Sequence, residues 1–432
     1  MGWHPAFGYG ILLGITVLFI WLVVLRFIRN LGSGYWDLNM PHLPKIILKK
    51  GREKPLLRGH PWVFSGAVER IEEPLSPGDA GEAYSSRGDF LGIGHLNPHS
   101  QIVFRLLASR KEEMGASFFR DRIMNALRLR RPWLDGAIQA YRIVNGEGDF
   151  LPGLIVDRYA DVLVIQVLTA GMERLKELLV EILADALRPE SIYERSDVST
   201  RREEGLPEAR GLLFGKDIPD RLEIEERGCR FRVNVKEGQK TGFYLDQREN
   251  RHRVGMISQG NRILDLCSYT GAFSVYAGRS GAKELTLIDA SQEALDRAEE
   301  HLHLNHLETI PHRMIRGDAF EVLRSLRPDY DVAILDPPPF ARKKGNLPKA
   351  ARGYKDLNLQ AFRLLGPEGL LFSFSCSHHM GWDLFQKVVL AAAVDAGRKV
   401  QLLGRMGHPI DHPVSLFHPE GEYLKGLMCR AN

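Results

Sequence analysis

Cysteine is scarce in this chain of 432 residues. Its four cysteines, Cys229, Cys267, Cys376 and Cys429, lie far apart. They show neither the paired spacing of a zinc site nor the dense framework of a disulfide-stabilised secreted protein. Free thiols suit a reducing cytoplasm. The chain also lacks internal repeats and low-complexity tracts, so repeat arrays and long disordered linkers are excluded.

The net charge of the chain is also small. Lysine and arginine number 58 against 54 aspartates and glutamates, so the formal charge is only +4. This excess suits a polyanionic partner without requiring one, because scattered lysines usually serve solubility. A chain of this length allows two or three domains, each with its own core.

Glycine is sparse in the first chemically informative segment, residues 262–273. An apolar run containing Asp265 leads through a turn with Tyr269 and a single glycine, Gly271, into an apolar helix start. A nucleotide-binding βαβ unit opens in this way, but a dinucleotide needs several glycines beside its pyrophosphate. The turn therefore argues against a dehydrogenase and favours S-adenosylmethionine, which has a ribose and no phosphate. An ordinary strand-to-helix connection is the alternative interpretation of the turn alone.

A second short β-prone run, residues 285–289, ends at Asp289. This acid follows the turn by about 20 residues, the spacing at which an acid reaches ribose hydroxyls. The candidate cofactor-binding residues in these two segments are Asp265, Tyr269, Gly271 and Asp289.

The third segment, residues 330–340, is an apolar run that ends in an acid, three prolines and an aromatic residue. These are Asp336, Pro337, Pro338, Pro339 and Phe340. Prolines hold the backbone rigid, so the acid is placed beside an aromatic face on which a flat base can stack. We expect Pro337, Pro338 and Phe340 to contact a substrate base.

The fourth segment, residues 370–377, carries a thiol, Cys376, toward the same sheet edge, where open α/β sheets bind ligands. Carbon C5 of cytosine is too electron-poor to attack a methyl sulfonium unaided, whereas a thiolate added at C6 makes C5 nucleophilic. Cys376 is therefore the candidate nucleophile, and Asp336 would hydrogen-bond the N3 and amino edge of the base. A buried apolar role is the alternative for Cys376, and it is the expected role of the other three cysteines.

From about residue 45 to residue 430 the chain resembles the RlmI-type large-subunit ribosomal RNA (cytosine-C5) methyltransferases. The stretches that carry the resemblance are residues 51–54, 60–67, 193–197, 240–248, 268–271, 336–338, 352–356, 374–377 and 411–413. The resemblance implies an α/β catalytic fold, the doubly wound sheet of class I methyltransferases, preceded by a PUA-like β-barrel and a small central α/β domain. It also implies S-adenosylmethionine as methyl donor and large-subunit ribosomal RNA as partner.

The resemblance implies roles for individual residues. Cys376 is the expected nucleophile and Asp336 its base-binding partner, in agreement with the chemistry above. Other cytosine-C5 RNA enzymes carry a second cysteine after the acid, where this chain has Pro339. Product release would then need another residue, and His378, His379 and His412 all stay open.

Further cofactor contacts are expected just before the first catalytic strand. Residues 231–235 and 241–245 bracket residues 237–240 in a pattern that predicts a hairpin, and by resemblance this segment closes over the methyl donor. Tyr244, Asp246 and Gln247 are the cofactor candidates there. Asp318 stands where such folds place a partner for the adenine amino group, or it caps a helix.

The expected division of the chain is residues 1–40, 41–112, 113–225 and 226–432. Between residues 45 and 58 lie six basic residues and one acid, followed by short alternating runs such as residues 90–94 and 101–107. Such a pattern predicts a small β-barrel with a basic, RNA-binding face. Lys50, Arg52 and Trp62 are the candidate RNA contacts.

The segment of residues 113–225 has the pattern of a compact α/β domain. It opens with a predicted helix over residues 118–131. Strands are then predicted at residues 141–144, 154–158, 162–168 and 191–195, with an amphipathic helix over residues 173–187.

The first 40 residues contain the one long apolar run. Residues 6–25 carry no charge and precede Arg26 and Arg29, which meets the criteria for a membrane helix with a cytoplasmic positive end. In one interpretation this segment tethers the enzyme to the cytoplasmic face of the inner membrane. In the other, which we favour because ribosome chemistry is cytosolic, translation starts at Met40. The catalytic part is cytoplasmic in both.

Three other possibilities stay open from the sequence. The same fold could methylate a guanine at N7 or N2 without a thiol nucleophile. It could also have become a non-catalytic RNA-binding factor of ribosome assembly. Association of two copies into a homodimer is undecided by the sequence.

Overall fold

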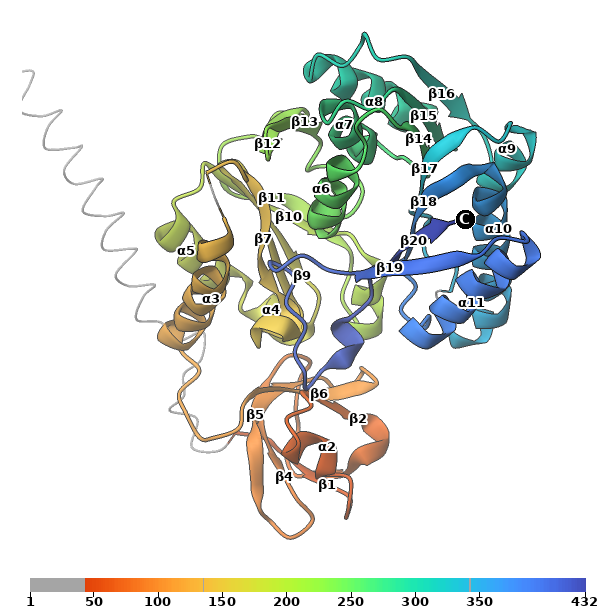
Figure 1. Cartoon of the computed structure of the whole chain (residues 1–432). Coiled ribbons are helices and arrows are strands. Elements are labelled where there is room, and N and C mark those ends of the chain that lie inside the picture. Colours follow the sequence, from red (N-terminus) through yellow and green to blue (C-terminus); the bar gives the residue numbers. More distant parts are fainter. Residues whose placement is uncertain (1–42, 135, 342) are drawn as a thin grey trace, which may run out of the picture.

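The computed structural model of the protein describes residues 43–134, 136–341 and 343–432. Its three parts follow one another along the chain: the amino-terminal part lies at the bottom of Figure 1, the central part at the left and the carboxyl-terminal part at the right. The predicted membrane segment, residues 6–25, and Met40 lie outside the described residues. Within those ranges no helix combines the length and the apolar character that crossing a membrane requires.

The amino-terminal part is built on a six-stranded sheet with the order β2-β6-β5-β4-β1-β3. Its elements are β1 (Lys45–Leu48), α2 (Lys54–Leu57), β2 (Trp62–Phe64), β3 (Val68–Ile71), β4 (Ala80–Tyr84), β5 (Phe90–Leu96) and β6 (Ile102–Ala108). The alternating runs at residues 90–94 and 101–107 lie in β5 and β6, so the prediction of a β domain is confirmed. Ile46, Leu48 and Phe104 lie at the centre of its small core, which is separate from the cores of the other two parts.

The central part has a five-stranded sheet with the order β11-β10-β9-β8-β7. Its elements are α3 (Ala116–Arg130), β7 (Ala140–Asn145), β8 (Leu154–Tyr159), β9 (Val162–Val167), α4 (Ala170–Arg174), α5 (Lys176–Leu187), β10 (Ser191–Ser196) and β11 (Ala209–Gly215). Phe119 and Ile123 of α3 share one apolar core with Leu179 and Ile182 of α5. The predicted α/β character of this part is therefore confirmed.

The helix predicted over residues 173–187 is confirmed from Lys176 to Leu187, but the prediction that it runs unbroken from residue 173 is wrong. The structure has two helices that meet at Leu175, whose backbone (φ −92°, ψ −1°) lies far from the ideal α-helical angles. The first helix begins earlier than predicted because the Thr169 hydroxyl accepts a hydrogen bond from the Met172 amide and caps it. A polar cap of this kind carries no apolar periodicity, so the hydrophobic pattern alone missed it.

The predicted hairpin over residues 231–245 is also wrong. The hairpin joins β12 (Leu222–Glu226) to β13 (Cys229–Val233). Its two loop residues, Arg227 and Gly228, both have positive φ, as a tight primed turn requires. Residues after Val233 instead form turns, in which Asn234 Oδ1 accepts hydrogen bonds from the backbone amides of Lys236 and Glu237. The expected domain boundary between residues 225 and 226 falls inside β12.

The carboxyl-terminal part has a seven-stranded sheet with the order β16-β15-β14-β17-β18-β20-β19. Its strands are β14 (Arg262–Leu266), β15 (Glu284–Asp289), β16 (His312–Arg316), β17 (Tyr330–Leu335), β18 (Leu365–Ser375), β19 (Val400–Met406) and β20 (Lys425–Ala431). Its helices are α6 (Arg248–Met256), α7 (Ala272–Arg279), α8 (Gln292–Leu304), α9 (Ala319–Ser325), α10 (Leu347–Leu364) and α11 (Trp382–Asp395). Strands β14 to β18 are parallel, and β20 is antiparallel to both its neighbours.

Both faces of this sheet are covered by helices. Ile263 points toward α7 and α8, whereas its neighbour Leu264 points toward α10 and α11. A strand that is buried on both faces needs an apolar run rather than an alternating one, which is why the four segments were recognisable in the sequence. The predicted doubly wound α/β sheet is confirmed, and it collects the carboxyl ends of β14, β15, β17 and β18 along one edge.

Short 3-10 helices complete the chain. They are η1 (Ser65–Ala67), η2 (Arg131–Trp133), η3 (Gly146–Asp149), η4 (Ser199–Glu204), η5 (Leu245–Gln247), η6 (Lys344–Asn346) and η7 (Pro419–Gly421).

The long connection from β19 to β20 ties the three parts together, and Asp411 is its anchor. The Asp411 carboxylate accepts two hydrogen bonds from Arg248 of α6, at 3.0 and 2.9 Å, and one from the backbone amide of Arg142 in β7, at 2.9 Å. The Asp411 carbonyl accepts a hydrogen bond from Arg130, which also pairs with Asp149. All of these groups are buried, so each charge depends on its partner.

Replacing Asp411 with alanine should therefore strongly destabilise the protein. The substitution leaves the Arg248 guanidinium buried without its carboxylate, and removal of one partner of a buried pair costs about 3–5 kcal/mol. Thermal unfolding would measure this as a lower midpoint. Asp383→Ala is the matched control, because Asp383 pairs with Lys387 on the exposed face of α11 and should change the midpoint little. Equal midpoints for the two variants would contradict the anchoring role of Asp411.

Candidate functional site

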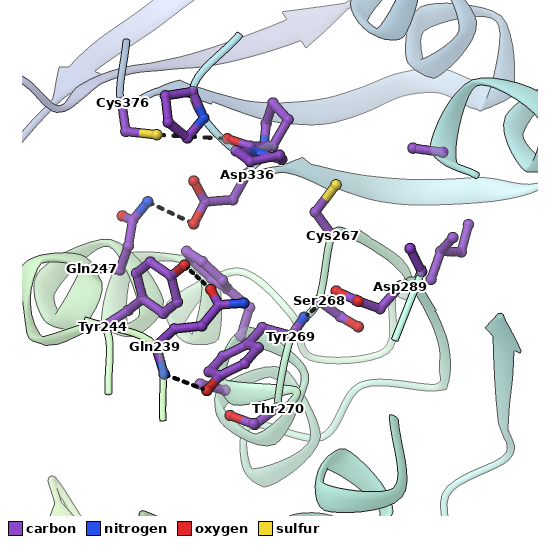
Figure 2. A pocket seen from close by; sticks show the side chains of 18 of the residues that line it. Gln239, Tyr244, Gln247, Cys267, Ser268, Tyr269, Thr270, Asp289, Asp336 and Cys376 are labelled. Carbon is purple, nitrogen blue, oxygen red and sulfur yellow. Dashed lines mark hydrogen bonds between the residues drawn. The ribbon is translucent and has the colours of Figure 1, made fainter. Parts of the chain in front are cut away.

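A cavity of about 520 Å³ opens at the carboxyl edge of the large sheet. The ends of β14, β15, β17 and β18 form its floor, the segment of residues 239–247 covers it, and Tyr423 and Leu424 close one side. Its volume falls in the range of small-molecule sites. Figure 2 shows Cys376, Asp336 and Gln247 gathered in one half, with Asp289, Ser268, Tyr269 and Thr270 in the other.

The turn after β14 places residues 267–270 in the cavity wall but not Asp265 or Gly271. Asp265 is buried below the turn and accepts a hydrogen bond from the Ser274 hydroxyl at 2.7 Å. Burial raises the pKa of this carboxyl to about 7. Gly271 has φ +70°, and a Cβ there would lie 2.8 Å from the Cβ of Ala298. These two predicted cofactor residues therefore shape the turn from behind rather than line the cavity.

Asp289 and Asp318 both line the cavity, as predicted. Asp289 accepts hydrogen bonds from the amides of Tyr269 and Ser291, each at 2.9 Å, and so holds the turn after β14 against the end of β15. Asp318 accepts from the amides of Phe320 and Glu321 at the start of α9. It is thus a helix N-cap and a cavity residue at once, which joins the two alternatives drawn from the sequence.

The covering segment is bound to the turn through side chains. The Tyr269 hydroxyl accepts a hydrogen bond from the Gln239 amide at 3.1 Å, and Tyr244 donates to the Gln239 side chain. Asp246 is paired with Lys240 and accepts a hydrogen bond from the Tyr423 hydroxyl at 2.8 Å. Burial opposes ionisation of Asp246, but Lys240, His412 and the Tyr423 hydroxyl together outweigh it, so the pKa of this carboxyl lies well below its usual range.

The other half of the cavity holds the groups predicted to act on a base. Pro337, Pro338 and Phe340 line it beside Asp336 and Cys376. The Cys376 thiol lies 3.7 Å from the carbonyl oxygen of Pro337. Burial and the neighbouring Asp336 raise the pKa of the Cys376 thiol to about 12. Burial and Asp246 likewise raise the pKa of Asp336 to about 7.

Buried hydroxyls fix the thiol relative to the proline loop. The Ser377 hydroxyl accepts a hydrogen bond from the Ala341 amide at 3.2 Å and lies 3.0 Å from the Tyr354 hydroxyl. Phe340 packs on Tyr354, with ring centroids 4.7 Å apart. The loop after β17 and the end of β18 are therefore one rigid unit.

Lys50, Arg52 and Trp62, predicted to contact RNA, lie outside the cavity. Lys50 and Arg52 are exposed after β1. Trp62 instead lies at a domain interface: its indole N–H donates to Glu147 of the central part at 2.9 Å, and its ring centroid lies 4.4 Å from that of His418. An aromatic residue beside basic charge was read as an RNA contact, but its partners are elsewhere in the chain.

The three histidines considered for product release are not among the residues that line the cavity. His412 is fully buried beside Asp411, and His378 is exposed. Sequence reasoning also missed three residues near the site. Lys240 and Tyr423 bind Asp246, and Lys425 is buried beside the end of β18, where it donates to the Ser377 carbonyl at 3.0 Å. Burial lowers the pKa of Lys425 to about 8.

Comparison with known proteins identifies two domain families in the chain. Residues 46–109 match the PUA-like domain family, and residues 206–415 match the S-adenosylmethionine-dependent methyltransferase family. The ribosomal RNA large subunit methyltransferase I of Aeromonas salmonicida is 46% identical over 392 residues, which span 89% of this chain and 99% of that protein. The protein of the same name from Yersinia pseudotuberculosis is 44% identical over 393 residues, with the same coverage.

Solved structures share the fold. A protein described as an S-adenosylmethionine-dependent methyltransferase from Streptococcus mutans superposes with a TM-score of 0.77 at 24% identity, over 89% of this chain and 99% of that one. A second methyltransferase structure, complexed with S-adenosylhomocysteine, superposes with a TM-score of 0.78 at the same identity and coverage.

The cofactor of this chain is therefore S-adenosylmethionine, as predicted, and the cavity fits it. Three buried oxygens that line the cavity, Ser268 Oγ, Thr270 Oγ1 and Asp246 Oδ1, have no hydrogen-bond partner among the described residues. Buried polar atoms are normally satisfied. Hydroxyl and carboxylate oxygens suit the amino and ribose groups of this cofactor.

Gly271→Ala should weaken binding of S-adenosylmethionine together with stability. A side chain at φ +70° costs about 1–2 kcal/mol in itself, and here it also meets Ala298, which pushes the cofactor turn out of place. Gly260→Ala is the matched control, because Gly260 has φ +72° and open space around its Cβ position. Titration calorimetry should show a cofactor affinity that falls in the Gly271 variant and stays near wild type in the Gly260 variant. Equal losses would mean that the clash is irrelevant.

Proposed function

Because this chain belongs to the family of the ribosomal RNA large subunit methyltransferase I enzymes, we propose that it methylates C5 of a cytosine in large-subunit ribosomal RNA. The observation that carries this proposal is the pairing of Cys376 and Asp336 in one half of the cofactor cavity. Methylation of a guanine nitrogen would need no thiol at this position. An RNA substrate of the ribosome also implies a cytoplasmic enzyme.

Bound S-adenosylmethionine supplies a methyl group activated by a positive sulfonium. In our proposal Ser268, Thr270 and Asp246 hold it through the three oxygens that have no hydrogen-bond partner in the described part of the chain, and Asp289 and Asp318 complete its site with Tyr244 and Tyr269. Asp246 stays ionised beside Lys240, so the cofactor half carries the charge that suits an ammonium group.

Cys376 provides the covalent step. The thiol gives up its proton to solvent as its sulfur adds to C6 of the cytosine, which forms an S–C6 bond and moves the electrons of the C5–C6 double bond toward the N3 side of the ring. Asp336 donates its proton to N3 as this happens, because a pKa of about 7 keeps part of the carboxyl protonated near neutrality. C5 then forms a bond to the transferred methyl group, with S-adenosylhomocysteine as the leaving group, and N3 returns its proton to Asp336. Loss of the C5 proton re-forms the C5–C6 double bond and expels Cys376 as thiolate.

The base enters beside Phe340 and the prolines. The Phe340 ring offers an apolar face at the cavity wall, and Pro337 and Pro338 have no amide hydrogen to compete with the base for Asp336. A cytosine must leave its stack to reach the thiol, as enzymes that act on bases require.

The basic stretch at residues 49–58 is the proposed RNA-binding surface of the PUA-like domain. Its basic members are exposed, namely Lys49, Lys50, Arg52, Lys54 and Arg58. The exposed rings of Phe64 and Phe417 offer faces on which bases can stack, in addition to the predicted contact of Trp62. Basic groups beside exposed rings suit single-stranded RNA.

The decisive test of the proposed function is methyl transfer from labelled cofactor into deproteinised large-subunit RNA from a strain lacking the gene. Wild type should form 5-methylcytidine, and Cys376→Ala should reduce the rate at least about 10³-fold while cofactor affinity stays within a few-fold, since the thiol acts on the base. Cys429→Ala is the matched control, because Cys429 is buried in β20 against Leu371. A methylguanosine that persists in Cys376→Ala would overturn the proposal.

Charge reversal at Lys50 and Arg52 should weaken RNA binding and its dependence on salt. For single-stranded RNA each phosphate contact contributes about 0.7 to the slope of log affinity against log salt concentration. The double variant Lys50→Glu, Arg52→Glu should therefore show a slope lower by about 1.4 in filter binding, with cofactor affinity unchanged. Lys216→Glu, an exposed lysine after β11, is the control. A slope equal to wild type would remove these residues from the RNA surface.

A further inference from the structure

A chain of side-chain amides leads away from Asp336 into the protein. Gln247 Nε2 donates to Asp336 Oδ2 at 2.9 Å. Gln247 Oε1 accepts from Asn250 Nδ2 at 2.6 Å, and the same Asn250 nitrogen donates to the carbonyl oxygen of Gly407 at 3.1 Å. Gln247 and Asn250 are each 2% exposed, so water does not compete for these groups.

The direction of every hydrogen bond in this chain follows from its inner end. A backbone carbonyl can only accept, so the Asn250 amide must turn its NH₂ group toward Gly407. That nitrogen has a second hydrogen, which Gln247 Oε1 accepts. The Gln247 amide is thereby oriented with its own NH₂ group toward Asp336.

We propose that Asn250 is a positioning residue, which orients Gln247 so that one oxygen of Asp336 is held and the other is aimed at the target base. This inference rests on the proposed role of Asp336. Gln247 was predicted from the sequence to contact the cofactor, and the chain of amides gives it a second task on the substrate side. Asn250 itself touches neither cofactor nor base, and it acts through Gln247.

Gln247 is the hydrogen-bond partner of the Asp336 side chain among the described residues. It occupies Oδ2 and leaves Oδ1 for the cytosine edge. A carboxyl group with one held oxygen presents the other in a defined direction, which matters because a proton is transferred only over hydrogen-bond distance. Without the held oxygen the carboxyl group could rotate in the cavity.

The amide chain also acts on the protonation of Asp336, together with the ionisable groups around it. Those groups are Asp246 and Lys240 of the covering segment, Asp265 of β14, the Tyr244 phenol, and the thiols of Cys267 and Cys376. Donation from Gln247 favours the ionised form and therefore lowers the pKa of Asp336, against burial and Asp246, which raise it. Reversal of the Gln247 amide would remove this donor and raise the pKa further.

Asn250→Asp reverses the chain. An aspartate at this position accepts a hydrogen bond from the Gln247 NH₂ group, which turns Gln247 Oε1 toward Asp336. The protonated Asp336 then donates its hydrogen bond to Gln247 Oε1 rather than to the base. We expect kcat/KM for methyl transfer to fall about tenfold or more. Because the protonated form of Asp336 is the active one, the fall of kcat/KM on the alkaline side should move to higher pH.

A double-mutant cycle separates positioning from an added charge or general damage. In a Gln247→Ala background, Asn250→Asp should change kcat/KM and its pH profile much less than in wild type, because the residue through which it acts is gone. Asn250→Ala breaks the chain without adding a charge, and it should shift the profile in the same direction by less. Equal effects of Asn250→Asp in both backgrounds would overturn the proposal.

Asn305→Asp is the matched control. Asn305 is also a buried amide that donates to two backbone carbonyls, those of Arg230 and His301, but it lies at the end of α8. It should lower the unfolding midpoint without moving the pH profile. A cooperative thermal unfolding transition in each variant shows that the variant is folded. The cycle is measured on whichever nucleoside wild type methylates, so failure of the amide chain is distinct from failure of the cytosine assignment, which Cys376→Ala decides.

Discussion

The buried ion pair between Asp411 and Arg248 is the interaction on which the rest of the structure depends. Arg248 is the first residue of α6 and directly follows Gln247, whereas Asp411 lies in the connection between β19 and β20. Two buried charges have one low-energy arrangement, because each loses its solvation unless the other is in place. The pair therefore sets where α6 begins relative to the connection, and with it the position of Gln247 beside Asp336. Arg142 and Arg130 extend this constraint into the central part.

The two carboxyl groups of the cavity, Asp246 and Asp336, have different pKa values because their surroundings differ. Asp246 has Lys240 and the Tyr423 hydroxyl as partners and stays ionised. Burial and the negative Asp246 nearby raise the pKa of Asp336 to about 7, although its one amide donor, Gln247, acts in the opposite direction. When their environments give two carboxyl groups different pKa values, one can bind positive charge while the other accepts or donates a proton. The ionised Asp246 itself contributes to keeping Asp336 protonated, so the two halves of the cavity are electrostatically coupled.

Much of the catalytic fold could be predicted because its signals are local. An apolar run buried on both faces and ending in an acid marks a strand of the sheet, and parallel strands bring such ends to one edge. Asp289, Asp336 and Cys376 were found in this way. Asp265 and Gly271 have the same local signal, yet they support the turn from behind, since the pattern does not tell which side of a turn faces the cavity. The hairpin was misplaced because Gly238 and Gly242 gave a stronger turn signal than Arg227 and Gly228, which contain a single glycine.

Contacts between distant residues were beyond local patterns. Asn250 and Gly407 are 157 positions apart, and nothing near either residue names its partner. Trp62 is a second case, because its place beside basic residues predicts an RNA contact, whereas no local pattern indicates that its indole N–H donates to Glu147 and that its ring lies against His418 at a domain interface. Such an interface fixes the position of the amino-terminal part relative to the cavity. The Phe417 ring lies against Gly59, where a Cβ would come within 2.8 Å of it, and Tyr423 of the same connection lines the cavity. One anchored stretch of chain thus links the basic surface to the thiol, and in the proposed function it sets the distance that an RNA strand would span between them.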